Sequence, residues 1–294
     1  MISKCTLCYP TMQVVLMCLF LSAWSVRGEE GYKLPDLSQS QKGRLDRIKS
    51  ALRYTEWQST DRNGWNLYVA ATNMAQLVCL LLPSDVKCET EAVAGEIPTC
   101  RVHCARENTN GVMESIAFNV WLCPSIEIAR EGVLRWFLNV SAPLPYLIKE
   151  WEREDVRYGD MNFGSSVWVS GNVMFELTDG GANRKLVTEV FSSIDKTLQV
   201  VPMATSNSTG DIGVAVTGGM SDSSWAINLP RRPVRQQMVI STRNATLERL
   251  SPDVLIAKRK EDDKEVVLRF VVIEREKELR AYNHRITPGV ARTP

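Results

Sequence analysis

The residue types best suited to catalysis or metal binding are scarce in this chain. Only two histidines occur, His103 and His284, although histidine is the usual general base and the commonest metal ligand near neutral pH. Neither lies in a catalytic signature. The glycines between residues 210 and 219 lack the lysine that a phosphate-binding loop needs. We therefore predict no catalytic residue and no cofactor.

The segment Cys100-Arg-Val-His-Cys104 has two thiols beside a histidine, which suggests zinc. Structural zinc takes four ligands, and no second ligand pair with matching spacing is present. We expect no metal. Disulfide formation is the more common use of such cysteines in an oxidising compartment.

Eight cysteines are present, of which Cys5, Cys8 and Cys18 belong to the expected leader. The disulfide candidates that remain are Cys79, Cys88, Cys100, Cys104 and Cys123. Because their number is odd, one thiol is left over, either as a buried thiol or as the link to another chain. The spacing alone does not decide the connectivity.

Residues 1–28 read as a signal peptide. Lys4 precedes the apolar run from Val14 to Trp24, which is shorter than the about 20 apolar residues of a membrane-spanning helix. Polar residues follow at once from Glu29. No later apolar stretch is long enough to span a membrane, so we expect a secreted protein or one in the lumen of the secretory pathway.

Two kinds of modification site agree with that routing. Sequons place N-glycosylation at Asn139, Asn207 and Asn244. Arg232 and Arg235 have the spacing that dibasic processing proteases read in exposed loops. An uncleaved basic turn ahead of a strand is the alternative for this pair.

Charge is unevenly distributed. Residues 231–294 carry 15 Lys/Arg and 9 Asp/Glu, whereas the rest of the mature chain is acidic. A basic C-terminal third suits glycosaminoglycans, anionic membranes or an acidic partner, although its basic residues alternate with acids in the manner of a solvated surface. No basic stripe for nucleic acid is present.

The N-terminal half predicts helices around the cysteines. Ser38 and Gln41 have capping-box spacing ahead of a helix that would run to about Trp57. A second helix is expected over residues 125–138. Residues 65–82 remain open between a buried helix and two strands, and residues 117–122 suggest a strand.

The C-terminal half predicts strands, because β-branched and aromatic runs alternate with Gly, Asn and Asp clusters. Strands are expected at 165–177, 185–194, 197–203, 211–216, 225–229 and 236–241, with a hairpin joining 254–259 to 266–273. The predicted fold is α+β: a helical, cysteine-bearing region at 29–145, then a predominantly antiparallel, sandwich-like β region at 146–294.

The intervals Cys79–Cys88 and Cys104–Cys123, which follow a helix, resemble the two consecutive disulfide loops of secreted cystatins. This resemblance implies a helix wrapped by an antiparallel sheet and inhibition of papain-like proteases. It also implies a Gln-x-Val-x-Gly hairpin ahead of the first cysteine. The segment Gln76-Leu-Val-Cys-Leu80 keeps the Gln and the Val of that motif but has Leu80 at the glycine position.

These observations favour a non-catalytic, N-glycosylated binding protein that acts on a protein partner, as a ligand-sequestering factor, a receptor or adhesion ligand, or a subunit of a glycoprotein complex. A cystatin-like inhibitor is the alternative. A carboxylate-dependent hydrolase, which would use the acidic group Glu152, Glu154 and Asp155, is a third hypothesis.

Overall fold

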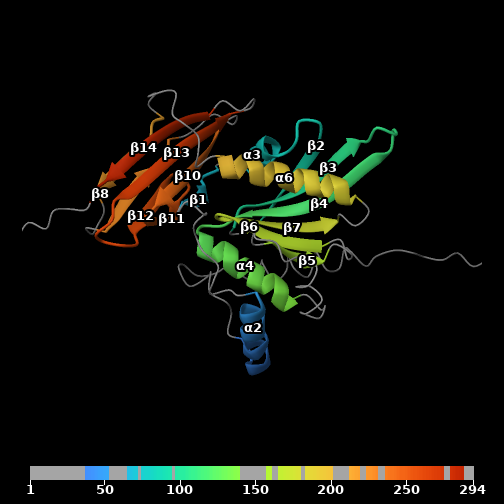
Figure 1. The fold of residues 1–294 in the computed structure, drawn as a ribbon, viewed down its shortest axis with the longest axis horizontal. Helices are drawn as coiled ribbons and strands as arrows, with labels where there is room; N and C mark the ends of the chain where they lie inside the picture. The colour runs from blue at the N-terminus through green and yellow to red at the C-terminus, as the bar shows by residue number, and fades with distance from the viewer. Residues whose placement is uncertain are drawn as a thin grey trace, which may run out of the picture.

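The computed structural model describes residues 37–52, 65–71, 74–94, 97–139, 157–160, 165–179, 183–200, 212–218, 223–230, 236–274 and 279–287. The expected leader and three site residues, Asn207, Arg232 and Arg235, lie outside them. The described part is an α+β fold in which three antiparallel sheets dominate, as predicted at that level (Figure 1).

The larger layer is a six-stranded antiparallel sheet in the order β2-β3-β4-β7-β6-β5. Its strands are β2 (Lys87–Val93), β3 (Thr99–Glu107), β4 (Met113–Leu122), β5 (Arg157–Asp160), β6 (Ser165–Ser170) and β7 (Val173–Asp179). Since β4 pairs with β7, this sheet takes strands from both sides of the expected border at 145/146.

Helices cover both faces of this sheet (Figure 1). On one face lie α3 (Met74–Leu81) and α6 (Arg184–Val200); on the other lies α4 (Ile126–Asn139), with α2 (Gln39–Ala51) packed on it. Successive residues of a strand point to opposite faces. Phe118 and Val120 of β4 therefore pack under α3 and α6, whereas Trp121 packs under α4.

The expected first helix is confirmed, although it ends at Ala51 and not near Trp57. Both bonds of the capping box between Ser38 and Gln41 are present. Leu45 and Ile48 are buried against α4. The second expected helix is α4, whose first turn is capped by Ser125 Oγ accepting from Ile128 N at 3.3 Å.

The smaller layer is a sandwich of two four-stranded sheets. One has the order β1-β10-β13-β14, formed by β1 (Asn66–Val69), β10 (Gln236–Arg243), β13 (Val266–Glu274) and β14 (Leu279–Ile286). The other has the order β11-β12-β9-β8, formed by β8 (Ala215–Gly218), β9 (Ser224–Asn228), β11 (Ala245–Ser251) and β12 (Val254–Arg259). Tyr68, Ile240, Leu255 and Phe270 are among the side chains that fill the space between the two sheets.

Two predictions in the C-terminal half were wrong. Residues 185–194 and 197–203 were expected as strands, but residues 184–200 form helix α6 and the rest lie outside the described residues. Val190, Ile194 and Leu198 recur at helical spacing and are buried against the sheet. Tertiary packing of this apolar stripe outweighs the strand preference of the β-branched residues.

The expected hairpin between 254–259 and 266–273 was also wrong. Both segments are strands, but β12 pairs with β9 and β11, whereas β13 pairs with β10 and β14. The polar turn at 260–263 therefore carries the chain from one sheet of the sandwich to the other. Such crossings are common in two-sheet folds, because sequential strands do not always pair.

Residues 65–82, whose structure the sequence left undecided, contain one strand, β1, and one helix, α3. Strand β1 joins the two layers. It is an edge strand of the sandwich, paired with β10. Val69, Val239 and Val271 point out of the sandwich and pack in the same cluster as α3 and α6. The buried Asn172, at the turn between β6 and β7, binds the other edge of β1: its Oδ1 accepts from Val69 N at 2.7 Å.

Candidate functional site

The outer face of the sheet β1-β10-β13-β14 changes character along its length. At one end Val239, Val271 and Ile273 are buried against the helical layer. Toward the other end the same face presents Arg243 and Arg269, because side chains two residues apart on a strand share a face. One sheet face is therefore apolar where it meets the other layer and basic where it leaves it.

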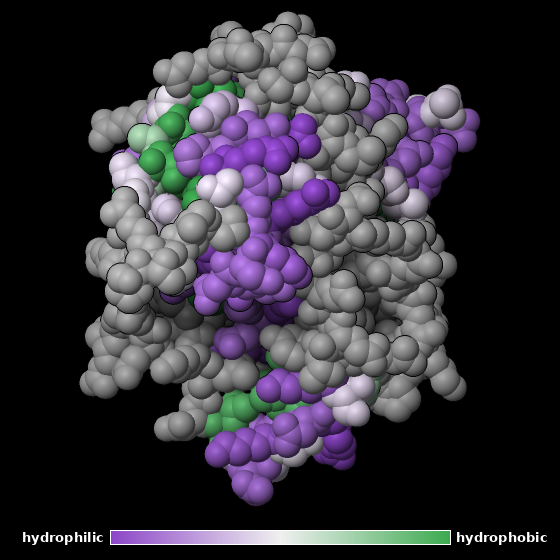
Figure 2. All heavy atoms as spheres, turned by 60° about the vertical axis from the view of Figure 1, so that its left-hand side comes forward, coloured by the Kyte–Doolittle hydropathy of each residue, from purple (hydrophilic) through white to green (hydrophobic). Residues whose placement is uncertain are grey.

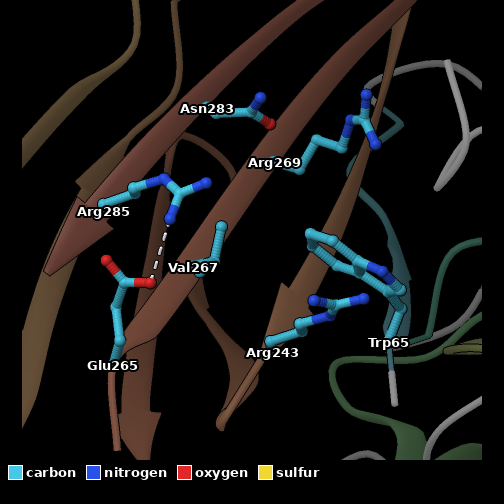
Figure 3. Close-up of a pocket in the computed structure, with 7 residues that line it drawn as sticks. All are labelled: Trp65, Arg243, Glu265, Val267, Arg269, Asn283 and Arg285. Atoms are coloured by element: carbon cyan, nitrogen blue, oxygen red, sulfur yellow. Dashed lines mark hydrogen bonds and ion pairs between the residues drawn. The ribbon is translucent and has the colours of Figure 1, made fainter. Parts of the chain in front are cut away.

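A pocket of about 230 Å³ lies at the basic end (Figure 3). Its walls come from the residue before β1, from β10, from β13 with its preceding residue, and from β14. They are Trp65, Arg243, Glu265, Val267, Arg269, Asn283 and Arg285. The strand pairing brings them together: Arg243 lies opposite Val267, which lies opposite Arg285, and Arg269 lies opposite Asn283.

Trp65 lies between two of the guanidinium groups in Figure 3. The Cζ of Arg243 is 4.5 Å from the centre of its ring, and that of Arg269 is 6.0 Å away. Each contact of this kind contributes about 0.5–1 kcal/mol at an accessible site. The indole therefore limits the rotamers of both arginines and holds their N–H groups near the pocket.

The pocket is cationic. Three arginines face one carboxylate, Glu265, which pairs with Arg285 at 3.2 Å. Burial lowers the pKa of Arg269, but a guanidinium remains protonated at every physiological pH. Arg243 and Arg285 are exposed to solvent. A negatively charged group is what this arrangement of donors attracts.

A second group of charges, around Arg106 of β3, differs from this pocket. Arg106 binds Glu114 at 3.1 Å, Asp85 at 3.3 Å and also Glu189 of α6. Hydrogen bonding to Arg106 lowers the pKa of the Glu114 carboxyl. Since three carboxylates surround the one guanidinium, this cluster fastens α6 to the sheet.

The sequence did not single out the pocket residues. The sequence indicated an excess of basic residues after 231, and Arg269 lies within the strand expected at 266–273. Trp65 lies far away in the sequence, at the start of the segment 65–82, whose structure the sequence left open. No local pattern connects it with Arg243, so only the fold reveals the pair.

Four of the candidate cysteines gather on the α3 side of the six-stranded sheet. They are Cys79 on α3, Cys88 on β2, and Cys100 and Cys104 on β3. Cys123 follows β4 and lies in the cluster on the α4 side. The Cys104–Cys123 loop that the cystatin resemblance implies would thus join cysteines from opposite faces of the sheet.

Neither histidine belongs to a metal site in the part of the chain that the structure describes. No group of three or more His, Cys, Asp or Glu side chains there is arranged to hold an ion. On β3, the side chain of His103 points to the face of the sheet opposite to Cys100 and Cys104, and it is exposed. His284 lies on β14, opposite Leu268.

The segment from Gln76 to Leu80 does not form the hairpin that the cystatin resemblance implies. These residues lie inside helix α3. The acidic group Glu152, Glu154 and Asp155 lies outside the described residues.

Of the sequon asparagines, Asn139 is the last residue of α4, and Asn244 stands at the tight connection between β10 and β11. Asn244 adopts a left-handed backbone with φ of 58°, which few residues other than glycine and asparagine adopt readily. Its Nδ2 donates to Glu261 O at 2.7 Å and to Lys264 O at 2.9 Å, and its Oδ1 accepts from Glu261 N at 2.8 Å. The side chain therefore holds the 260–264 turn.

We expect Asn244→Ala to lower the free energy of unfolding by about 2 kcal/mol, because it removes three hydrogen bonds and places alanine in a left-handed conformation. Thr246→Ala removes the same sequon but leaves Asn244 in place, so it should cost little. Urea unfolding of both variants, expressed without glycans, measures the difference. Equal losses in the two variants would contradict a structural role for Asn244.

The described residues thus form an α+β protein with a cationic aromatic pocket on a β-sandwich. No protein-family model, curated protein or solved structure matches the chain. In the described part of the chain, no helix combines the length and the hydrophobicity that crossing a membrane requires.

Proposed function

We propose that this protein is a non-catalytic binding protein that recognises an acidic segment of a protein partner through the pocket around Trp65. The observation that carries this proposal is that three arginines, Arg243, Arg269 and Arg285, line one pocket with a single paired carboxylate, and that the indole ring of the same pocket contacts the first two of them. The pocket offers hydrogen-bond donors and an aromatic face, which are features of recognition sites.

The chemistry of the pocket favours carboxylates. A guanidinium presents two parallel N–H donors that match the two oxygens of a carboxylate, and such charge-assisted bonds are stronger than neutral ones. The volume of about 230 Å³ is below the about 300–1,000 Å³ typical of small-molecule pockets. It suits one or two acidic side chains that project from a larger partner.

The surroundings support a contact with a polar partner. In the view that brings the sandwich forward, hydrophilic residues form a band across the face of the molecule (Figure 2). Polar, solvent-accessible residues also make up the rims of protein interfaces. Steering by the arginines would also raise the rate at which an acidic partner docks.

We further propose that the protein acts in the secretory pathway or outside the cell. The leader pattern at residues 1–28 and the sequons at Asn139, Asn207 and Asn244 support this routing. A glycan at Asn244 would replace one of the two Nδ2 protons, and with it one of the hydrogen bonds to Glu261 O and Lys264 O. Expression in mammalian cells tests it. Protein in the medium that begins after residue 28 and loses mass on enzymatic deglycosylation supports the proposal, whereas cytosolic protein with Met1 intact contradicts it.

The binding proposal predicts that Arg243→Gln/Arg285→Gln weakens the binding of a fluorescent oligoglutamate peptide about tenfold or more. Each charge-assisted bond contributes about 1.5–3 kcal/mol, and about 1.4 kcal/mol is a factor of ten in affinity. Both arginines are exposed, so the variant should fold. Fluorescence anisotropy measures the affinity, and added salt should weaken binding by the wild type.

Arg101→Gln provides a matched control. Arg101 lies on β3, away from the sandwich, and pairs with Glu91 at 3.4 Å, as Arg285 pairs with Glu265. This variant should bind the peptide like the wild type. Equal losses in the control and the pocket variant, or binding of heparin oligosaccharides in the pocket with none of oligoglutamate, would refute the proposed acidic protein partner.

A further inference from the structure

Cys79 and Cys88 bring together two neighbouring elements of the helical layer. Cys79 lies on the exposed side of α3, and Cys88 lies on β2, at the edge of the six-stranded sheet. Their Sγ atoms are 2.9 Å apart, whereas a disulfide bond is about 2.05 Å long. Small rotations of the two side chains close this gap.

The pairings with Cys104 within the β2–β3 ladder, and any pairing with Cys123, have less favourable geometry. Cys88 lies directly opposite Cys104 in the β2–β3 ladder, where Cβ atoms are about 4.5–5.5 Å apart, against about 3.8 Å in a disulfide. Cys100 and Cys104 are four residues apart on one strand, which separates them by about 13 Å. Cys123 lies on the opposite side of the sheet.

We propose that Cys79 and Cys88 form an intramolecular disulfide that fastens α3 to β2, and that the other three cysteines stay as buried thiols. Cys100, Cys104 and Cys123 are 2%, 1% and 3% exposed, so they are shielded from oxidants and from other chains. Cys79 is the exposed cysteine among the five. A covalent link to another chain through this region therefore requires the Cys79–Cys88 bond to be open.

The bond forms by thiol–disulfide exchange with a small disulfide such as oxidised glutathione. The exposed Cys79 thiolate attacks one sulfur of the oxidant, forms a mixed disulfide and releases one glutathione thiol. Cys88 Sγ, deprotonated, then attacks Cys79 Sγ and releases the second glutathione. Two protein thiols are oxidised and one oxidant disulfide is reduced to two thiols, so atoms and electrons balance.

The position of the bond gives it a structural consequence. The other side of α3 presents Leu77 and Val78 to the cluster that also contains Val239 and Val271 of the sandwich. In addition, Ser193 of α6 donates to Leu81 O at 2.9 Å. A covalent bond from α3 to β2 therefore limits the movement of the helix against which the two layers pack.

Peptide mapping of the full-length protein after equilibration with oxidised glutathione tests this assignment. When the protein is alkylated before digestion, Cys100, Cys104 and Cys123 should be modified only if the protein is unfolded first. The peptides that contain Cys79 and Cys88 should stay joined until a reductant is added. Reduction should lower the melting temperature by about 5 °C.

Cys79→Ser is the control variant, because serine fits an exposed helix position and removes only one partner. In this variant, reduction should leave the melting temperature unchanged, and Cys88 should react with the alkylating reagent. A Cys88–Cys104 bridge in the wild type, or free Cys79 and Cys88 thiols after equilibration with the oxidant, would overturn the assignment. This test does not depend on the peptide-binding experiment.

Discussion

Replacing Asn172 with alanine should lower the free energy of unfolding by about 3–5 kcal/mol. The Asn172 amide binds both backbone groups of Val69: Oδ1 accepts from Val69 N at 2.7 Å, and Nδ2 donates to Val69 O at 3.1 Å. Nδ2 also donates to Cys123 O at 2.9 Å. Alanine leaves these three groups without partners, and each such buried group costs about 1–3 kcal/mol.

The size of this effect follows from where Asn172 lies. It has no solvent exposure, so water does not replace the lost bonds while the protein stays folded. Its partners belong to the two layers: Val69 is part of the sandwich, and Cys123 follows β4 of the six-stranded sheet. The amide thus hydrogen-bonds to the edge of β1 that faces away from β10, as the backbone of a neighbouring strand would. Its loss weakens the junction between the layers.

Guanidinium unfolding, followed by tryptophan fluorescence and circular dichroism, measures this loss. Asn110→Ala, at an exposed position of the β3–β4 turn, is the control and should change stability little. Gly171→Ala should also destabilise, because φ is 59° there and an added Cβ overlaps with Leu67 O. An Asn172→Ala variant that unfolds like the wild type would contradict the role of this side chain.

The sequence predicted those elements whose signals are local. The capping box of Ser38 and Gln41 and the apolar positions Leu45 and Ile48 are sufficient to locate α2. Residues 125–138 gave a similar helical pattern, and α4 spans Ile126–Asn139. In both cases the residues that cap the helix and the apolar residues on its buried side lie within a few turns of each other.

Helix α6 and the β12–β13 connection were missed because their outcome depends on distant partners. The β-branched residues of 185–200 suit a strand, but these residues form a helix whose buried stripe, which includes Val190 and Ile194, packs on the sheet. Phe191 of the same helix contacts the rings of Phe118 and Trp168. For β12 and β13, a short polar turn between apolar runs suggested a hairpin. Both strands instead find their partners elsewhere, in β9 and β10 among others.

The candidate site illustrates the same limit. Arg243, Arg269 and Arg285 lie on three neighbouring strands, β10, β13 and β14, and the spacing of residues in the sequence does not show that these strands are neighbours. Trp65 belongs to the N-terminal half of the chain. The cysteines were identified by type and number. The proximity of Cys79 to Cys88, unlike that of the other pairs, depends on how α3 lies over the edge of the sheet.

Glu176→Ala should lower the free energy of unfolding by about 2–4 kcal/mol near pH 5. Glu176 lies on β7 beneath α4, where its carboxyl accepts from Trp136 Nε1 at 2.9 Å and from Asn119 Nδ2 at 3.1 Å. Glu176 and Trp136 are 8% and 3% exposed. Alanine removes the acceptor of two buried donors and leaves a cavity between helix and sheet.

Glu176→Gln should instead gain stability relative to the wild type as the pH rises. Burial raises the pKa of the Glu176 carboxyl, and the hydrogen bonds from Asn119 and Trp136 offset part of that rise. The folded protein therefore keeps this proton to a higher pH than the unfolded chain, in which the pKa of glutamate is about 4.3. The contribution of the protonated group is complete below that pH and is lost as the pH rises through the folded pKa.

Glutamine does not titrate, and its carbonyl oxygen still accepts from Trp136. The difference in unfolding free energy between Glu176→Gln and the wild type should therefore shift in favour of glutamine between about pH 4 and pH 8. Glu107→Gln, at an exposed position of β3, controls for the loss of one carboxylate, and its difference from the wild type should not follow this trend. A constant difference for Glu176→Gln across this range would show that burial does not perturb the carboxyl. A shift in favour of the wild type would mean that the hydrogen bonds from Asn119 and Trp136 stabilise the charged form by more than its desolvation costs.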